Sequence, residues 1–332
     1  MIPTITVASW AELMEELYRE SWDQSIERFR SPFVFRGTAF ASSDLSTSLM
    51  RLPAVQGLAK RAAGIDPRRR VPAVATEPFR RWARGTSYEA DAMTTTPYDV
   101  VVWADSFTDS FAPEGGHAAV ELLEAAGLRV GVVGDAACCG LTWITTGQLE
   151  TARKVVTRTL DVLHPYVVRG TPVVGLEPSC LATLRSDAVQ LTDDPRAAEV
   201  AAGVRTLAEV LVGLPHWAPP DLTGTTVVVQ PHCHHASVLG WGADAALLER
   251  TGATVRRLGG CCGLAGSFGV EKGHYEVSVA VAELQLLPAV RDAGPDAVLL
   301  ADGFSCRTQL QDLAGRRALH LAELLNRATR TG

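Results

Sequence analysis

The chain has 332 residues, enough for one or two hydrophobic cores, and its 47% hydrophobic and 20% charged residues are typical of a globular protein. Its net charge of −6 gives no electrostatic basis for binding nucleic acid, and no apolar run approaches the roughly 18–20 residues of a membrane-spanning helix. The N-terminus lacks the basic and apolar regions of a signal peptide, and seven cysteines, an odd number, do not suit a secreted disulfide framework. We therefore expect a reducing, cytoplasmic setting.

The first 97 residues differ in character from the rest. Residues 1–52 combine an expected helix at about 10–28 with the segment Phe33-Val34-Phe35-Arg36-Gly37. Residues 53–97 form a basic linker rich in Arg, Pro and Ala, with the run Arg68-Arg69-Arg70. Such a run can contact nucleic acid or a membrane, but a solvated helix face is the commoner case and the one that we expect.

Residues 98–215 alternate between expected strands and helices. Val100–Trp103 and Val130–Val133 are apolar runs typical of buried parallel strands, and a helix is expected between them at about 114–126. An amphipathic helix at about 147–164 then precedes the strand Pro172–Gly175. This order predicts an α/β subdomain with a parallel sheet.

Residues 222–326 repeat the same order about 125 residues later. The strand Val227–Val229 is followed by a helix that ends at Gly252, a helix at about 275–291 and the strand Ala297–Leu300. The nearly constant offset indicates an internal duplication. We therefore predict an α/β fold of two duplicated subdomains, each a parallel sheet flanked by helices.

Six of the seven cysteines repeat with these subdomains. Ala137-Cys138-Cys139-Gly140 matches Gly260-Cys261-Cys262-Gly263, and each is followed about 40 residues later by a lone cysteine, Cys180 or Cys306. All of them fall at the carboxyl ends of expected strands, where sites form in such sheets. Adjacent thiols are too close for an unstrained disulfide, but both can bind one metal centre. The pattern therefore predicts thiolate ligation.

The second subdomain has a full set of four thiols, Cys233, Cys261, Cys262 and Cys306. Four thiolates are the usual ligands of a [4Fe–4S] cluster, and they suit tetrahedral zinc equally well. Isolated cysteines are often no more than small buried hydrophobic residues, and a Cys-Cys pair can act as a disulfide switch. The duplication favours ligation over both alternatives.

The first subdomain offers three thiols, Cys138, Cys139 and Cys180, as a possible second site. The position that corresponds to Cys233 falls near Asp105. Three thiolates and a carboxylate can hold a cluster or zinc. A degenerate copy retained for packing is an equally good interpretation, and the sequence leaves both open.

Other polar residues accompany the cysteines. His232, His234 and His235 flank Cys233 and could bind a metal, donate to a cluster sulfur or carry a proton, although a polar loop at the mouth of a cleft explains them equally well. Arg307 could steady an anionic cluster or substrate, or form a surface salt bridge. The glycines of residues 260–269 lack nucleotide-binding spacing, so we expect them to allow tight turns around the metal centre.

Taken together, these motifs resemble the cysteine-rich (CCG) domain family of iron–sulfur oxidoreductases. The likeness covers roughly residues 55–332 and is greatest to the C-terminal part of FAD-linked oxidase/iron–sulfur proteins of the D-lactate dehydrogenase and glycolate oxidase type. The segments that carry it are residues 105–111, Cys138-Cys139-Gly140 with Gly147, 175–180, 232–234, 261–275, 301–307 and 315–323.

The resemblance implies Rossmann-like subdomains and an oxidoreductase component that transfers electrons through an iron–sulfur cluster. Electrons would pass from FAD on a partner, a flavoprotein subunit or domain that oxidises a 2-hydroxy acid such as lactate or glycolate, to an acceptor, for example a quinone. A position in the cytoplasm or at the inner face of the membrane would suit this role. Zinc-bound assembly without redox activity, and thiol–disulfide chemistry like that of heterodisulfide reductase, are the alternatives.

Three departures from the family pattern restrict the expected cofactor and activity. The sequence shows no FAD domain and no C-x₂-C-x₂-C-x₃-C-P ferredoxin module, so we expect it to be inactive alone. Where heterodisulfide reductase ends its motifs in C-x-x-C, Glu177 and Gly303 replace the first cysteine, which favours a single [4Fe–4S] cluster over a non-cubane double cluster.

Residues 1–52 have a different likeness. Phe33-Val34-Phe35-Arg36-Gly37, followed by Ser48-Leu49-Met50-Arg51, is similar to the opening of the FRG domain, which is named for its Phe-Arg-Gly motif. Only the start of such a domain fits before Pro53, so we interpret residues 1–52 as an FRG-like fragment.

Overall fold

The computed structural model describes residues 53–95 and 97–331. The FRG-like fragment of residues 1–52, with its expected helix at 10–28, lies outside the described residues.

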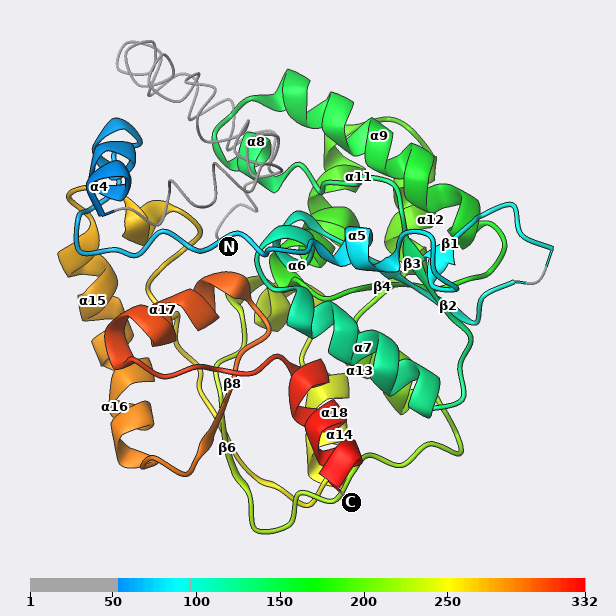
Figure 1. Ribbon diagram of the computed structural model, residues 1–332. Coiled ribbons are helices and arrows are strands. Elements are labelled where there is room, and N and C mark those ends of the chain that lie inside the picture. Colours follow the sequence, from blue (N-terminus) through cyan, green and yellow to red (C-terminus); the bar gives the residue numbers. More distant parts are fainter. Residues whose placement is uncertain (1–52, 96, 332) are drawn as a thin grey trace, which may run out of the picture.

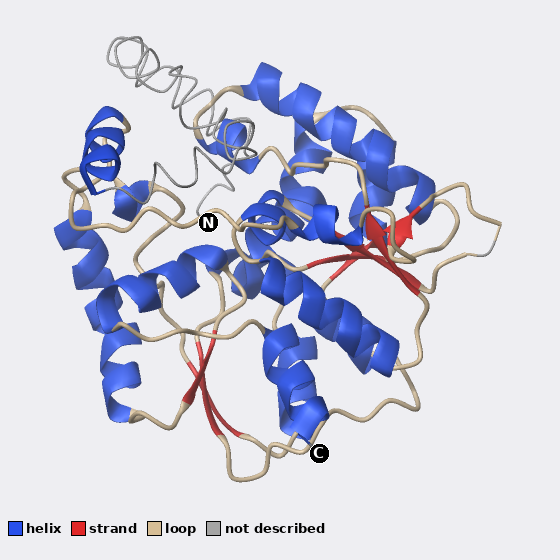
Figure 2. Cartoon of the chain, viewed as in Figure 1, coloured by secondary structure: helices blue, strands red, loops and turns tan. Residues whose placement is uncertain are grey.

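Two separate parallel sheets organise the part of the chain that the structure describes (Figures 1 and 2). The first has the order β1-β3-β2-β4-β5 and the second the order β7-β6-β8. The strands are β1 (Glu89–Ala90), β2 (Val100–Trp103), β3 (Val130–Val133), β4 (Val173–Gly175), β5 (Val204–Arg205), β6 (Thr226–Val229), β7 (Thr254–Arg257) and β8 (Val298–Leu300). Helices flank both sheets, which confirms the predicted α/β class. The central order β3-β2-β4 of the first sheet recurs as β7-β6-β8, and this supports the predicted duplication.

The connecting helices vary widely in length. They are α4 (Pro53–Ala62), α5 (Phe79–Ala83), α6 (Ser106–Ser110), α7 (Pro113–Ala125), α8 (Leu141–Thr145), α9 (Leu149–Val167), α10 (Pro178–Ala182), α11 (Ala188–Leu191), α12 (Arg196–Gly203), α13 (Leu207–Val212), α14 (Gly242–Arg250), α15 (Tyr275–Leu284), α16 (Leu286–Asp292), α17 (Phe304–Ala314) and α18 (Leu321–Thr331). The other helical elements of residues 53–95 and 97–331 are two π-helical segments, η1 (Thr183–Asp187) and η2 (His235–Leu239), and the 3₁₀ turn η3 (Phe268–Val270).

The apolar runs form the central strands because every residue in them is buried. All four residues of β2 and all four of β3 are buried, so these strands show no alternation and carry only hydrophobic side chains and one glycine. The edge strand β7, Thr-Val-Arg-Arg, is instead mostly exposed, which is why its sequence gives a weak strand signal.

One hydrophobic core joins the two sheets. It includes Val102 of β2 and Val229 of β6, together with Leu123 of α7 and Leu325 of α18. Helix α7 packs against α18, and α13 packs against α14, so two helix pairs lie between the halves (Figure 1). Each half therefore buries its helices against the other.

The expected single helix at 275–291 is wrong. The structure divides it into α15 and α16 at Gln285, whose backbone dihedrals are φ −144° and ψ −46°. The reason is Pro288, whose ring would clash with the carbonyl of Leu284 in a continuous helix. At this break the Gln285 side chain bonds to the loop before Cys261, where its Oε1 accepts a hydrogen bond from Gly259 N at 3.1 Å.

The solvated helix face expected for the arginine run is also wrong. Arg69 lies outside any helix and is 1% exposed. Its guanidinium donates to Gly269 O at 2.7 Å, to Gln309 Oε1 at 2.7 Å and to Ser278 Oγ at 2.6 Å. Residues 53–97 thus bind the second half through the hydrogen bonds of Arg69 and contribute strand β1 to the first sheet. The segment therefore contacts both halves.

Replacing the buried guanidinium should cost much more stability than replacing its neighbour. We expect Arg69→Met to lower the free energy of unfolding by about 3 kcal/mol, because the buried acceptors around it lose their partner. Arg70→Met is the control: its side chain is 65% exposed, and the change should stay within about 0.5 kcal/mol. Denaturant unfolding of both full-length variants measures the difference, and equal effects would contradict the buried role.

Candidate metal centre

The four predicted ligands of the second subdomain lie together at the carboxyl ends of its strands. Cys233 follows β6, Cys261 and Cys262 follow β7, and Cys306 lies in the first turn of α17 after β8. Their thiols interact in the order Cys233–Cys261–Cys262–Cys306. Cys262 and Cys306 are buried, Cys261 is partly exposed and Cys233 is exposed. The cluster therefore runs from the interior to the surface.

The pKa of one thiol in this group, Cys261, is lowered. The pKa of Cys261 falls to about 2, first because of the Cys233 thiol and then because of the Cys262 thiol, and Gly263 N also donates to its Sγ at 3.3 Å. Interaction with Cys261 is the first cause that raises the pKa of both Cys233 and Cys262 above the ordinary thiol value. Cys261 is thus the thiolate that its neighbours stabilise, which is the form that binds metal.

The glycine after each cysteine pair is required by the backbone. Gly140 and Gly263 have φ angles of +81° and +89°, in the left-handed region that side chains disfavour. At Gly263 a Cβ would also lie 2.2 Å from the backbone oxygen of Ser278. The Cys-Cys-Gly turn can therefore pack against α15 only with glycine in third place.

The first subdomain brings Cys138, Cys139 and Cys180 together in the same way, but in a different electrostatic setting. The Cys139 thiol is the main cause that raises the pKa of Cys138. The same thiol favours ionisation of Cys180, yet burial and the carboxylates of Asp105 and Glu177 outweigh it and raise the pKa of Cys180 to about 12. All three thiols of this trio have a raised pKa, in contrast to Cys261.

Asp105, the residue expected near the fourth ligand position, caps a helix. Its Oδ1 accepts from Phe107 N at 2.9 Å and Thr108 N at 3.0 Å, and its Oδ2 accepts from Thr108 Oγ1 at 2.6 Å. Asp105 is fully buried, and burial followed by the charge of Glu177 raises its pKa to about 6. The carboxylate is therefore already engaged at the N-terminus of α6.

Glu177 connects the two cysteine sites. It caps α10, where its Oε1 accepts from Ser179 Oγ at 2.8 Å, and its Oε2 accepts from Phe304 N of α17 at 2.8 Å. Only 4% of the residue is exposed, and burial raises the pKa of its carboxyl. One side chain thus bonds to the helix of Cys180 and to the helix of Cys306.

Gly303, the second departure from the family motif, has a steric cause. A Cβ at this position would lie 2.4 Å from Cδ2 of the His232 ring. Burial lowers the pKa of this histidine to about 4, so the ring that fills the space is neutral. A cysteine at 303 would require His232 to move.

The remaining candidates take other places. His235 is buried and pairs with Asp244 rather than with a thiol, at 3.0 Å. Arg307 donates to the backbone carbonyls of Ala301 and Asp302, so it braces the end of β8. Gln230, which was not predicted as a site residue, donates from Nε2 to Gly260 O at 2.8 Å and so fixes the loop that leads to Cys261. Its position as a polar residue directly after the apolar β6 run is the sequence signal that could have identified Gln230.

Two segments of the chain, residues 104–185 and 243–311, match the family model of the cysteine-rich domain, CCG. They contain the two cysteine sites described above, apart from Cys233. The chain thus contains two segments of the cysteine-rich CCG domain, which confirms the resemblance carried by its motifs.

Three similar proteins represent its relatives. One subunit of the anaerobic glycerol-3-phosphate dehydrogenase of Escherichia coli (strain K12) is 26% identical over 291 residues, which cover 83% of this chain and 70% of that protein. The D-2-hydroxyglutarate dehydrogenase of Pantoea ananatis is 27% identical over 249 residues, 71% of this chain but 23% of that protein. Lactate utilization protein A of Exiguobacterium sp. is 25% identical over 246 residues, 69% of this chain and 97% of that protein. By name, the first two are a dehydrogenase subunit and a dehydrogenase, so homologues of this chain are oxidoreductases or subunits of them.

Among the helices of residues 53–95 and 97–331, none has both the length and the apolar composition that crossing a membrane requires.

The contact between Gly303 and His232 gives a direct test of the steric argument. Gly303→Ala should lower the free energy of unfolding by about 1–3 kcal/mol, because the new methyl group overpacks the imidazole. Gly242→Ala is the matched control, since nothing lies within 4 Å of a Cβ there, and it should be nearly neutral. Thermal or denaturant unfolding compares the two, and a neutral Gly303→Ala would show that His232 yields freely.

Asp105→Asn should flatten the dependence of stability on pH. The pKa of about 6 in the folded chain exceeds the ordinary value of about 3.9, so the folded state binds more protons between these values and loses stability as the pH rises through the interval. This difference in pKa corresponds to about 3 kcal/mol of unfolding free energy that the original chain loses as the pH rises. The amide variant should not lose it, because its side chain caps α6 without ionising. Unfolding measured from pH 4 to 7 would reveal this. Asp161→Asn, whose side chain is 58% exposed, should keep the slope of the original chain.

Proposed function

We propose that this chain is the iron–sulfur electron-transfer component of a flavin-linked oxidoreductase that acts on a 2-hydroxy acid. The observation that carries the proposal is the meeting of four thiols at the carboxyl ends of the second sheet, with the thiolate form favoured at Cys261. Four thiolates are the usual ligand set of a [4Fe–4S] cluster. The duplicated, Rossmann-like arrangement of the two cysteine-rich subdomains belongs to the same proposal.

The thiols of the second subdomain do not have the arrangement of a tetrahedral zinc site. A tetrahedral ion with Zn–S bonds of about 2.3 Å would place every pair of sulfurs about 3.8 Å apart. Among the described residues, the trio of potential ligands that lies within 4.8 Å is His235, Asp244 and Asp302, and no trio of thiols does so. The thiols therefore do not form a ready zinc site, and the likeness to the cysteine-rich domain of oxidoreductases is what favours a cluster.

The ligand residues would hold the cluster with one side toward solvent. Cys262 and Cys306 would bind it from the interior, and the exposed Cys233 would bind it where a partner can approach. When bound, the cluster would accept and release single electrons. The N–H of Gly263, which donates to Cys261 Sγ, would stabilise the added charge and so raise the reduction potential.

The names of the relatives support the choice of partner and substrate class. Two of the three refer to a 2-hydroxy acid, hydroxyglutarate or lactate, and one refers to a dehydrogenase subunit. We infer a flavoprotein partner that carries FAD, and an acceptor such as a quinone. A place in the cytoplasm or at the inner face of the membrane follows from that role.

The first subdomain is proposed to serve mainly as a scaffold. Two buried carboxylates, Asp105 and Glu177, oppose ionisation of Cys180, and both are occupied by hydrogen bonds to helix termini. These conditions disfavour a second anionic cluster there. The packing alternative for Cys138, Cys139 and Cys180 is therefore the one that we prefer.

Metal and sulfide analysis of the full chain tests the assignment. Anaerobic purification should yield a brown protein with about four irons and equivalent sulfide per chain. Cys262→Ser should lose most of both, whereas Cys180→Ser, the matched buried cysteine of the first subdomain, should retain them. Zinc in place of iron, or an unchanged iron content in Cys262→Ser, would overturn the assignment. Reduction of the cluster by a candidate flavoprotein and its hydroxy acid then tests the role.

A further inference from the structure

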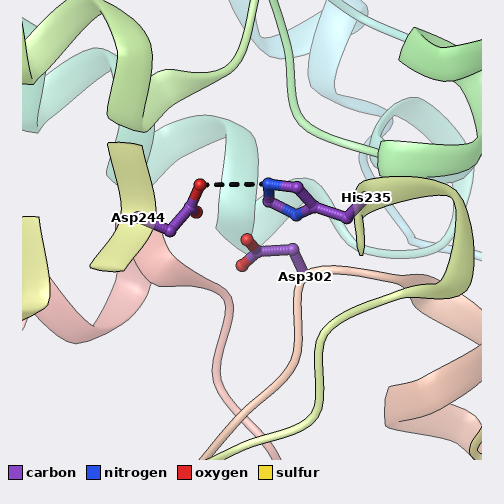
Figure 3. Close-up of side chains that lie close together, drawn as sticks. All are labelled: His235, Asp244 and Asp302. Atoms are coloured by element: carbon purple, nitrogen blue, oxygen red, sulfur yellow. Dashed lines mark hydrogen bonds and ion pairs between the residues drawn. The ribbon is translucent and has the colours of Figure 1, made fainter. Parts of the chain in front are cut away.

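A second group of ligand-type side chains lies beside the thiol site and is separate from it. His235, Asp244 and Asp302 each place a nitrogen or oxygen atom within 4.8 Å of the other two (Figure 3). His235 comes from η2, Asp244 from the first turn of α14, and Asp302 from the loop after β8. His235 and Asp244 are 3% exposed, and the Asp302 side chain is 15% exposed.

The charges of this trio are unbalanced without a cation. Two carboxylates face one imidazole, so the trio carries a net negative charge even with a protonated His235, and of the three only Asp302 is partly exposed. Asp302 Oδ1 accepts from Leu321 N at 2.7 Å, which satisfies part of its hydrogen-bonding capacity but adds no positive charge. His320 lies 3.6 Å from Asp302, but its Nδ1 accepts from Ala322 N and its Nε2 therefore donates to Leu176 O, as a neutral ring does. A divalent ion with a neutral His235 would balance the two carboxylates.

The geometry suits an ion. Nε2 of His235 and Oδ2 of Asp244 are 3.0 Å apart, and Figure 3 shows the carboxylate of Asp302 turned toward this pair. Two donors at right angles around an octahedral ion with bonds of about 2.1 Å are separated by about 3.0 Å. A cavity of about 10 Å³ borders all three residues, close to the room that one water or one ion occupies.

An unsatisfied oxygen supplies an independent observation. Gln230 lines the same cavity and is 2% exposed. Its Nε2 donates to the carbonyls of Pro231 and Gly260, while its Oε1 has no hydrogen-bond partner among the described residues. A buried carbonyl oxygen without a donor normally costs stability, and a cation in the adjoining cavity would satisfy it.

From these observations we propose that His235, Asp244 and Asp302 bind one divalent metal ion that prefers nitrogen and oxygen ligands, such as Mn²⁺, Fe²⁺ or Zn²⁺. The metal replaces the proton that His235 and Asp244 share, and that proton passes to solvent. The ion would connect the segment after Cys233 to the loop before the helix of Cys306. A second cavity, bordered by the same three residues, is also lined by Leu176 and Thr206 of the first half, so the ion would lie where the halves meet.

Titration of the full chain with Mn²⁺ tests the site, because thiolates bind this ion poorly and carboxylates bind it well. Loss of the free Mn²⁺ signal in electron paramagnetic resonance should show one bound ion per chain. Asp244→Asn and His235→Gln should each weaken binding about tenfold or more, and circular dichroism would confirm that they fold. Mn²⁺ should raise the melting temperature of the original chain but not that of these variants.

Two controls separate this site from its surroundings. Asp312→Asn removes another buried carboxylate of the second half, which lies 3.8 Å from Arg69, and should leave Mn²⁺ binding unchanged. Cys262→Ser should also keep it, because the proposal does not depend on the thiol cluster. The absence of a stoichiometric Mn²⁺ site, or equal binding by the original chain and folded Asp244→Asn, would overturn the proposal.

Discussion

The buried carboxylate of Glu177 is the contact on which the arrangement of the two cysteine sites depends. It caps the helix of Cys180 and also accepts from Phe304 N, at the start of the helix of Cys306. Both helices begin at the carboxyl end of a parallel strand, so one side chain fixes the relative positions of the two strand ends. A thiol in this place could not accept comparable hydrogen bonds from both helices. The residue that departs from the family's cysteine motif therefore gains a structural task.

The same carboxylate makes the two copies chemically unequal. Together with Asp105 it opposes ionisation of Cys180, whereas the thiols and the Gly263 N–H around Cys261 favour ionisation. Similar backbones thus offer a metal two different environments. Where negative charge is already buried, an anionic cluster is unfavourable. Where thiols and an amide stabilise one thiolate, it is favourable.

The elements that could be predicted from the sequence depend on local patterns and repetition. The apolar runs of β2 and β3, the helices α7 and α9 and the two Cys-Cys-Gly turns needed no knowledge of distant residues. The missed elements lack such signals: β1 and β5 are two residues long, and their pairing depends on the neighbouring strand. Arg69 resembles the solvent-exposed residues beside it, and only its distant acceptors distinguish it. The trio of His235, Asp244 and Asp302 has no recognisable spacing along the chain, so the fold alone reveals it.

The helix pairs between the halves also restrict how this chain can evolve. Because α7 packs on α18 and α13 on α14, either half alone would expose apolar helix faces that the other now covers. Substitutions can remove the ligands of the first copy one at a time, but a deletion that removed the copy would also destroy the surface on which the second copy folds. The helix contacts between the halves therefore oppose the loss of the first copy as a whole. The first subdomain therefore keeps a structural role, because the second subdomain folds against it.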